Sequence, residues 1–186
     1  MPSRSLKKLK KLSHIPVSKK HRTLAIDPGT REMGVAVLED DSLLYTGVET
    51  FRRLPSQEER LWQCRATVAR LIRDFRPTLL AVEKSFIGRK RHHTTLLGVL
   101  ADEILALGRR NGITVISLAA NTVKKDVAGN GCATKEEVAR AVTRRFPKLA
   151  AFLPPDRNWK RRHRLNMFDA VALALACSAG RNTRHS

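Results

Sequence analysis

The stretch that decides the fold is residues 24–39, LAIDPGTREMGVAVLE. Its first apolar run, Leu-Ala-Ile, stops at Asp27, a Pro-Gly pair follows, and a second apolar run begins at Met33. Pro and Gly between two apolar runs are typical of a hairpin turn. The stretch therefore predicts two antiparallel β-strands, the first of which ends on a carboxylate.

Outward from this hairpin, the hydrophobic pattern predicts an α/β domain. Strands are expected at residues 23–27, 34–39, 43–51, 78–83 and 113–117. Helices are expected from Ser56 to the proline at 77, at 94–110, and near 121–128, 134–146 and 164–179. Ser56 and Glu59 match a capping box. Three consecutive strands followed by β–α–β alternation predict a five-stranded mixed sheet flanked by helices.

The charge of the chain indicates what it binds. It has 186 residues, with 36 Lys and Arg against 17 Asp and Glu, and a net charge of +19. Such an excess favours a polyanionic partner, above all nucleic acid. A basic surface that serves solubility or binds anionic membranes is the alternative interpretation.

The length and the hydrophobic pattern favour one domain with no membrane span. Residues 1–22 carry eight Lys or Arg and no acid, which predicts a flexible basic arm that adds affinity for phosphate. A targeting segment is the alternative for this arm. The folded domain is expected at 23–180, followed by a short tail at 181–186.

The three cysteines, Cys64, Cys132 and Cys177, form no CxxC pair. This spacing predicts free thiols, a reducing compartment such as the cytoplasm, and no zinc site.

Two further acids stand at the edges of apolar segments. Glu83 ends the run LLAVE, and Asp169 lies near the start of the helical stretch NMFDAVALALACSA. Ordinary strand termination explains Glu83 alone, and complementing a helix dipole explains Asp169 alone. If the two acids meet Asp27, they form the oxygen site that Mg²⁺ prefers. Two such ions, about 3.5–4 Å apart, catalyse phosphodiester hydrolysis.

At this point four segments resemble one known family. IDPGTREMGVAVLE, AVEKSF, VKKDVAGNGCATKEEVARAV and DAVALALA are similar, in this order, to motifs of the RuvC Holliday junction resolvases. The resemblance covers residues 23–179, and it implies the RNase H-like fold of that family.

The resemblance also implies roles for individual residues. Asp27, Glu83 and Asp169 would bind two Mg²⁺ ions per active site, with Mn²⁺ as a substitute. Lys124 and Lys135 would contact the scissile region and support catalysis, and solvated helix charges are the alternative for both. Gly129 and Gly131 are expected to be turn glycines with positive φ.

One position departs from the family pattern. The family has an Asp or His three residues before its last aspartate, and this chain has Asn166. An amide oxygen coordinates a metal without contributing charge, so Asn166 is expected to be a weaker fourth ligand. His163 is an alternative replacement.

Basic segments on both sides of the expected cleft predict DNA contacts. Phe86 matches an aromatic of the family that engages bases, although a core phenylalanine is equally consistent with the sequence. The predicted DNA-binding residues are Phe86, Arg89, Lys90, Arg91, Lys125, Lys160, Arg161 and Arg162.

The function predicted from the resemblance is a metal-dependent endonuclease that resolves four-way DNA junctions. It would act as a homodimer that makes paired symmetric nicks and leaves 5′-phosphates, with branch-migration proteins as further partners. The apolar face of the helix at 94–110 is the expected dimer interface. Two alternatives are a junction-binding protein whose catalysis is weakened by Asn166, and an RNase H-like nuclease of RNA processing. The phosphate loop of sugar kinases and actin also resembles DPGT, but those proteins need two lobes.

Overall fold

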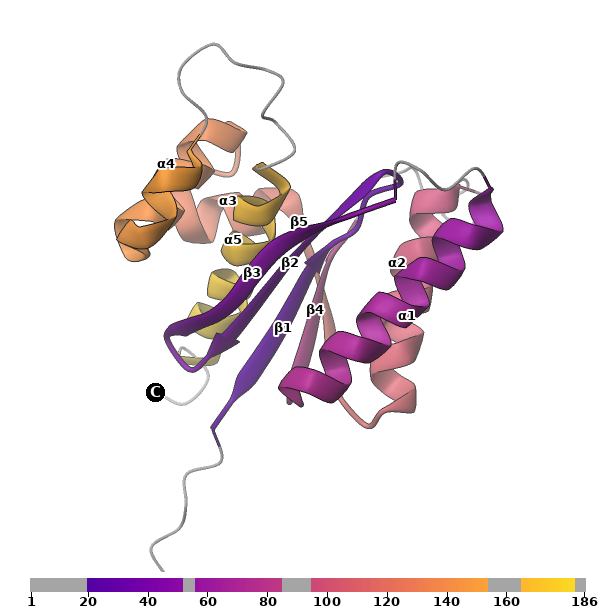
Figure 1. Cartoon of the computed structure of the whole chain (residues 1–186). Helices are drawn as coiled ribbons and strands as arrows, with labels where there is room; N and C mark the ends of the chain where they lie inside the picture. Colours follow the sequence, from indigo (N-terminus) through magenta and orange to yellow (C-terminus); the bar gives the residue numbers. More distant parts are fainter. Residues whose placement is uncertain (1–19, 52–55, 85–94, 154–164, 183–186) are drawn as a thin grey trace, which may run out of the picture.

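Figure 1 shows the computed structural model of the chain, which describes residues 20–51, 56–84, 95–153 and 165–182. The strands are β1 (Arg22–Asp27), β2 (Glu32–Glu39), β3 (Ser42–Thr50), β4 (Leu79–Lys84) and β5 (Thr114–Ala119). The helices are α1 (Gln57–Phe75), α2 (Leu96–Arg110), α3 (Ala120–Ala128), α4 (Lys135–Arg145), the 3₁₀ helix η3 (Pro147–Phe152) and α5 (Leu165–Asn182).

The strands form one mixed sheet in the order β3-β2-β1-β4-β5. β1 pairs antiparallel with β2 and parallel with β4, which confirms the five-stranded mixed sheet predicted from the sequence. The element boundaries lie within a few residues of the predicted ones. Two differences stand out: η3 was not predicted, and α5 continues through Asn182 into the predicted tail.

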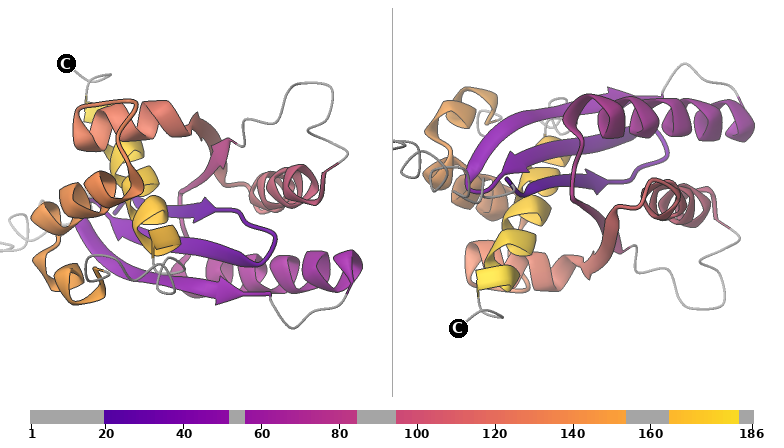
Figure 2. Two further views of the ribbon diagram at one scale, coloured as in Figure 1. Left: turned by 90° about the horizontal axis from the view of Figure 1, so that it is seen from above. Right: turned by 90° about the horizontal axis from the view of Figure 1, so that it is seen from below.

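Helices cover the sheet on both faces (Figure 2). α1 and α2 pack on one face, and α3, α4 and α5 lie together on the other. Because side chains alternate along a strand, Leu24 and Ile26 of β1 face α1 and α2, whereas Ala25 faces α5. Asp27 is two residues beyond Ala25, so the same alternation directs it to the α5 face.

The α5 face of the sheet is lined by small residues at its centre. Ala25, Ala36 and Ala81 are fully buried there against α5. Gly34 is two residues before Ala36 on β2 and shares this face. Small side chains let the axis of α5 come close to the strands, and this closeness brings the first turns of the helix to the end of β1.

The predicted capping box of α1 is confirmed, because the Ser56 and Glu59 side chains each accept a hydrogen bond from the other residue's backbone N–H. The apolar face of α2 contributes Leu100 and Ile104 to the core, while Val99 on the same helix stays exposed. The dimer interface expected on this helix stays a prediction.

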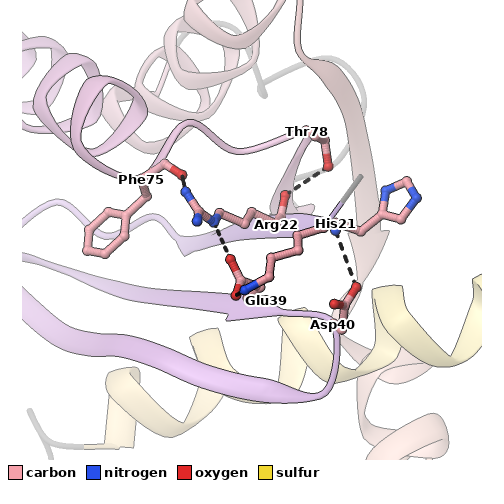
Figure 3. A network of polar contacts seen from close by, with 7 residues as sticks. His21, Arg22, Glu39, Asp40, Phe75 and Thr78 are labelled. Atoms are coloured by element: carbon pink, nitrogen blue, oxygen red, sulfur yellow. Dashed lines mark hydrogen bonds and ion pairs between the residues drawn. The ribbon is translucent and has the colours of Figure 1, made fainter. Parts of the chain in front are cut away.

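Residues 20–22, predicted as part of the basic arm, are attached to the domain (Figure 3). Arg22 opens β1, and its guanidinium donates to the Glu39 carboxylate at 2.6 Å and to the Phe75 carbonyl at 2.9 Å. Lys20 adds a second ion pair to Glu39 at 2.8 Å. Hydrogen bonds from Lys20 and Arg22 hold the pKa of Glu39 below its ordinary value. The chain therefore enters the domain at the end of β1 opposite to Asp27.

Within the described residues, no helix has the length and apolar character needed to cross a bilayer. The three cysteines are free, as predicted. Cys64 and Cys177 are buried and Cys132 is exposed. Burial, followed by the charge of Glu103, raises the pKa of the Cys64 thiol to about 12.

Candidate active site

Asp27 and Glu83 lie next to each other at the ends of two parallel strands. Ile26 of β1 pairs with Val82 of β4, and each carboxylate is the next residue along its strand. Glu83 is two residues beyond Ala81, which faces α5, so both acids point toward that helix. Their position at the ends of buried apolar strands is the one that the sequence predicted.

α5 brings the third acid to the same place. Asn166 and Asp169 are three residues apart in its first turns, so they share one face of the helix. Gly34, which pairs directly with Asp27 across the hairpin, makes the close approach possible. A Cβ atom added at Gly34 would lie 2.0 Å from the carbonyl oxygen of Asn166. Only a glycine fits between β2 and α5 at this point.

Burial raises the pKa of all three carboxylates, and the charge of Asp169 adds to the shift of the other two. Burial, then the charges of Glu83 and Asp169, raise the pKa of Asp27 well above its ordinary value. Burial and the charge of Asp169 also raise the pKa of Glu83. Burial raises the pKa of Asp169, although Lys135 and Lys124 oppose the shift. Acids kept buried beside one another despite this cost are typical of functional sites.

Among the described residues, Lys135 contacts this cluster with its ammonium group. It is the first residue of α4, which a capping box between Thr134 and Glu137 fixes in place. Its ammonium pairs with the Asp169 carboxylate and lies 3.5 Å from the Asn166 amide oxygen. Burial acts to lower the pKa of Lys135, but Asp169 and the other two acids outweigh it and leave the pKa above its ordinary value.

Lys124 lies on α3, and its charge acts on both Glu83 and Asp169. The turn between α3 and α4 begins at Gly129, whose φ of 77° confirms the predicted left-handed glycine. The same prediction is wrong for Gly131, which does not have a positive φ. Gly131 instead passes close to α3, where an added Cβ would lie 3.1 Å from the Asn121 carbonyl oxygen.

Glu32 is a residue of this region that sequence reasoning missed. The Asn166 side-chain amide donates to its carboxylate at 3.3 Å. Glu32 is the first residue of β2 and, by alternation with Gly34 and Ala36, lies on the α5 face. The available signal was its position directly after the hairpin turn, at the sheet edge where Asp27 ends its strand.

The donor atoms at this edge suit a hard divalent cation. They are carboxylate oxygens from Asp27, Glu83 and Asp169 and the amide oxygen of Asn166, and Mg²⁺ prefers oxygen ligands. Nowhere in the described ranges do three Asp, Glu, His or Cys side chains already converge enough to hold an ion. Lys135 engages one of the Asp169 oxygens. The site therefore fits such a cation by chemistry and charge once the side chains turn toward a common point.

A cavity of about 340 Å³ adjoins the cluster, lined by Lys135, Glu136, Leu165 and Asn166. Lys125 is exposed on α3, one residue beyond Lys124. The other seven residues named for DNA contact lie outside the described part of the chain, as does His163: Phe86, Arg89, Lys90, Arg91, Lys160, Arg161 and Arg162.

Comparison with known proteins gives a consistent result. The family profile described as "Crossover junction endodeoxyribonuclease RuvC" matches residues 23–176. A protein of that name from Acidiphilium cryptum is 35% identical over 133 residues, which are 69% of this chain and 80% of the relative. Another from Bradyrhizobium sp. (strain ORS 278) is 34% identical over 165 residues, covering 86% of this chain and 87% of the relative.

Solved structures agree with the fold. The Thermus thermophilus RuvC structure superposes with a TM-score of 0.66 at 26% identity and covers 87% of this chain and 96% of that one. The yeast mitochondrial Holliday junction resolvase Ydc2 superposes with a TM-score of 0.61 at 13% identity, covering 95% of this chain and 85% of that one. The RNase H-like fold predicted from the sequence is confirmed.

Proposed function

The chain belongs to the RuvC family of crossover junction endodeoxyribonucleases, the Holliday junction resolvases of DNA recombination and repair, and from that premise we propose that Asp27, Glu83 and Asp169 carry its phosphodiester hydrolysis. One observation supports this assignment above the others. Three partly buried carboxylates from three separate elements meet at a single sheet edge. There burial and the charges of Glu83 and Asp169 raise the pKa of Asp27.

The three carboxylates, with the Asn166 amide oxygen, would hold divalent cations, and Mg²⁺ or Mn²⁺ in a pair fits the oxygen donors. When bound, such ions supply the charge that activates a water and stabilises the leaving oxygen of the scissile phosphate. The protein contributes the fixed positions of Asp27 and Glu83 on rigid strands. It also contributes the low-dielectric surroundings that strengthen charge interactions at the site.

The two lysines would act on the phosphate side of the site. Lys135 keeps its proton, because the acids beside it raise its pKa. An ammonium on a flexible stem can release Asp169 and pair with a phosphate oxygen of the DNA. Lys124 would add a second positive charge on the α3 side. In this arrangement the lysines neutralise the acids before DNA binds and neutralise phosphate afterwards.

The substrate and the assembly follow from the family premise. We propose a four-way DNA junction, cut by paired symmetric nicks that leave 5′-phosphates. A homodimer with twofold symmetry would match such a substrate. The DNA would be contacted by Lys125 and by the basic residues of the segments around 86–91 and 160–162, with branch-migration proteins as further partners.

The test is cleavage of a labelled mobile four-way junction in Mg²⁺ or Mn²⁺, with linear duplex as the control substrate. Asp27→Asn should reduce paired nicking by about 100-fold or more, the scale of losing a group that stabilises transition-state charge. Asp41→Asn is the matched control, because Asp41 is an exposed acid in the turn between β2 and β3. It forms an ion pair with Arg145 of α4. It should cleave like the wild type. Tight junction binding without cleavage by the wild type in either metal would instead favour a binding protein.

A further inference from the structure

Glu32 brings a fourth carboxylate to the α5 face of the sheet. It is half-buried at the start of β2, and its carboxylate accepts a hydrogen bond from the Asn166 side chain at 3.3 Å. The two residues are 134 positions apart in the chain. The contact is therefore a product of the fold, and it forms directly beside the acids proposed for hydrolysis.

The surroundings of Asn166 fix which way its amide points. An ionised carboxylate only accepts hydrogen bonds and an ammonium only donates them. Glu32 faces the amide nitrogen, and the Lys135 ammonium lies 3.5 Å from the amide oxygen. A flipped amide would set its oxygen against the Glu32 carboxylate and its NH₂ group against the ammonium. The oxygen of Asn166 is therefore held toward Lys135 and Asp169.

From this geometry we propose that Glu32 is a positioning residue for the metal site, an inference that rests on the proposed metal-dependent function. Glu32 holds the Asn166 amide so that its oxygen would face a bound divalent metal ion. It also supplies, one hydrogen bond away, the negative charge that an asparagine lacks. Groups that orient a metal ligand in this way typically change metal affinity or activity by 10–100-fold when they are removed.

The hydrogen bond between Glu32 and Asn166 predicts that substitutions at these two positions have non-additive effects on metal affinity. Asn166→Asp alone sets a second carboxylate against Glu32. It also removes the NH₂ group that donates a hydrogen bond to Glu32, so it should not improve metal binding. In the Glu32→Gln background, the new side chain offers an NH₂ group to the carboxylate introduced at position 166. The negative charge is then restored at the ligand itself, with its hydrogen bond satisfied.

The experiment measures the Mg²⁺ and Mn²⁺ concentrations at half of the metal-induced rise in melting temperature, with junction cleavage recorded in parallel. Glu32→Gln keeps an acceptor and removes the charge, and Glu32→Ala removes both. The midpoint, which is the metal concentration at half of the rise, should increase about 10-fold in Glu32→Gln and further in Glu32→Ala. Asn166→Asp should bind no more tightly than the wild type, and Glu32→Gln/Asn166→Asp should regain most of the affinity. Asp41→Asn should match the wild type.

Two results would overturn the role of Glu32 alone. One is a wild-type midpoint in both Glu32→Gln and Glu32→Ala while Asp27→Asn loses the metal response. The other is an Asn166→Asp effect that is the same with and without Glu32→Gln. A wild-type melting temperature that ignores both metals, or a response that survives Asp27→Asn, would overturn the metal site and the role of Glu32 with it. A cooperative melting transition without metal shows that each variant folds.

Discussion

Gly34 determines how closely α5 packs on the sheet, and so where Asp169 lies relative to Asp27. It pairs with Asp27 across the hairpin, and the backbone of α5 at Asn166 lies directly over it. The distance between the strand that ends at Asp27 and the helix that carries Asp169 therefore depends on the absence of a side chain here.

Gly34→Ala should reduce cleavage far more than its methyl group suggests. The added Cβ would lie 2.0 Å from the Asn166 carbonyl oxygen and 2.7 Å from its carbon, and both are backbone atoms that cannot turn aside. α5 must shift, and a displacement of about 1 Å at catalytic groups costs about 100-fold in rate. Overpacking should also cost about 1–3 kcal/mol of stability. Junction cleavage and urea unfolding measure the two effects.

Gly112→Ala is the matched control for this substitution. Gly112 has a φ of 68° at the end of α2, and an added Cβ would meet no atom within 4 Å. The strained backbone should cost stability without moving α5. If both variants lost stability and both kept full cleavage, α5 would not need Gly34 to hold its position.

The residues of the site were predictable to different degrees. Asp27 and Glu83 were predicted as candidates because each follows an apolar strand, a pattern local to a few residues. Glu32 was missed because its importance lies in a contact with Asn166, and no local pattern marks a contact over that separation. Gly131 was assigned a positive φ because it follows Gly129 in a turn, whereas its observed constraint is the nearby Asn121 carbonyl.

At the scale of elements, α1 and α2 are joined by an ion pair as well as by apolar contacts. The Arg65 guanidinium of α1 contacts both carboxylate oxygens of Glu103 on α2, at 2.9 and 3.2 Å. Arg110 reaches the same carboxylate at 3.5 Å. The hydrogen bond from Arg65 is the main cause that holds the pKa of Glu103 below its ordinary value.

Glu103→Gln should lower stability at pH 7 by about 0.5 kcal/mol, a value reduced by the exposure of the arginine. Because the folded-state pKa of Glu103 is lowered, the pair stabilises above the ordinary glutamate pKa of 4.5. This contribution disappears as the pH falls through the folded-state pKa. Urea unfolding at pH 7 and near pH 3 should show a difference between variant and wild type that is smaller at the lower pH. An equal loss at both would mean that packing, and not charge, is responsible.

The elements themselves were largely predictable, because their signals are local. Both ends of α1 were marked, by the Ser56 capping box and by the proline at 77. The 3₁₀ helix η3 was missed because a turn of six residues, Pro147–Phe152, is too short to show helical periodicity. The apolar face of α2 was identified correctly, and Leu100 and Ile104 of that face pack inside the domain. An apolar stripe cannot by itself distinguish a core from an interface, so the dimer interface expected on α2 stays a prediction.

At the scale of the whole molecule, the point where the chain enters the domain and the acids lie at opposite ends of β1. Arg22 and Asp27 bound that strand, which spans about 17 Å at the usual rise per residue. The ion pairs of Lys20 and Arg22 with Glu39 set the starting point of the arm. Lys20, where the described chain begins, is therefore at the end of β1 opposite to Asp27. We expect the charge of residues 1–19 to act on DNA beyond the cleavage site.

Deleting residues 1–19 tests this role and leaves the Glu39 ion pairs in place. The deletion removes six basic residues: Arg4, Lys7, Lys8, Lys10, Lys11 and Lys19. Each phosphate that the arm no longer neutralises should reduce the slope of log affinity against log salt by about 0.9. The truncated chain should therefore bind four-way junctions more weakly at low salt, with a shallower slope, yet cleave bound junctions at the wild-type rate. A full-length variant with these six residues changed to Gln should behave like the truncation, because charge and not length is responsible. A slope that neither change alters would mean that the arm does not touch the DNA.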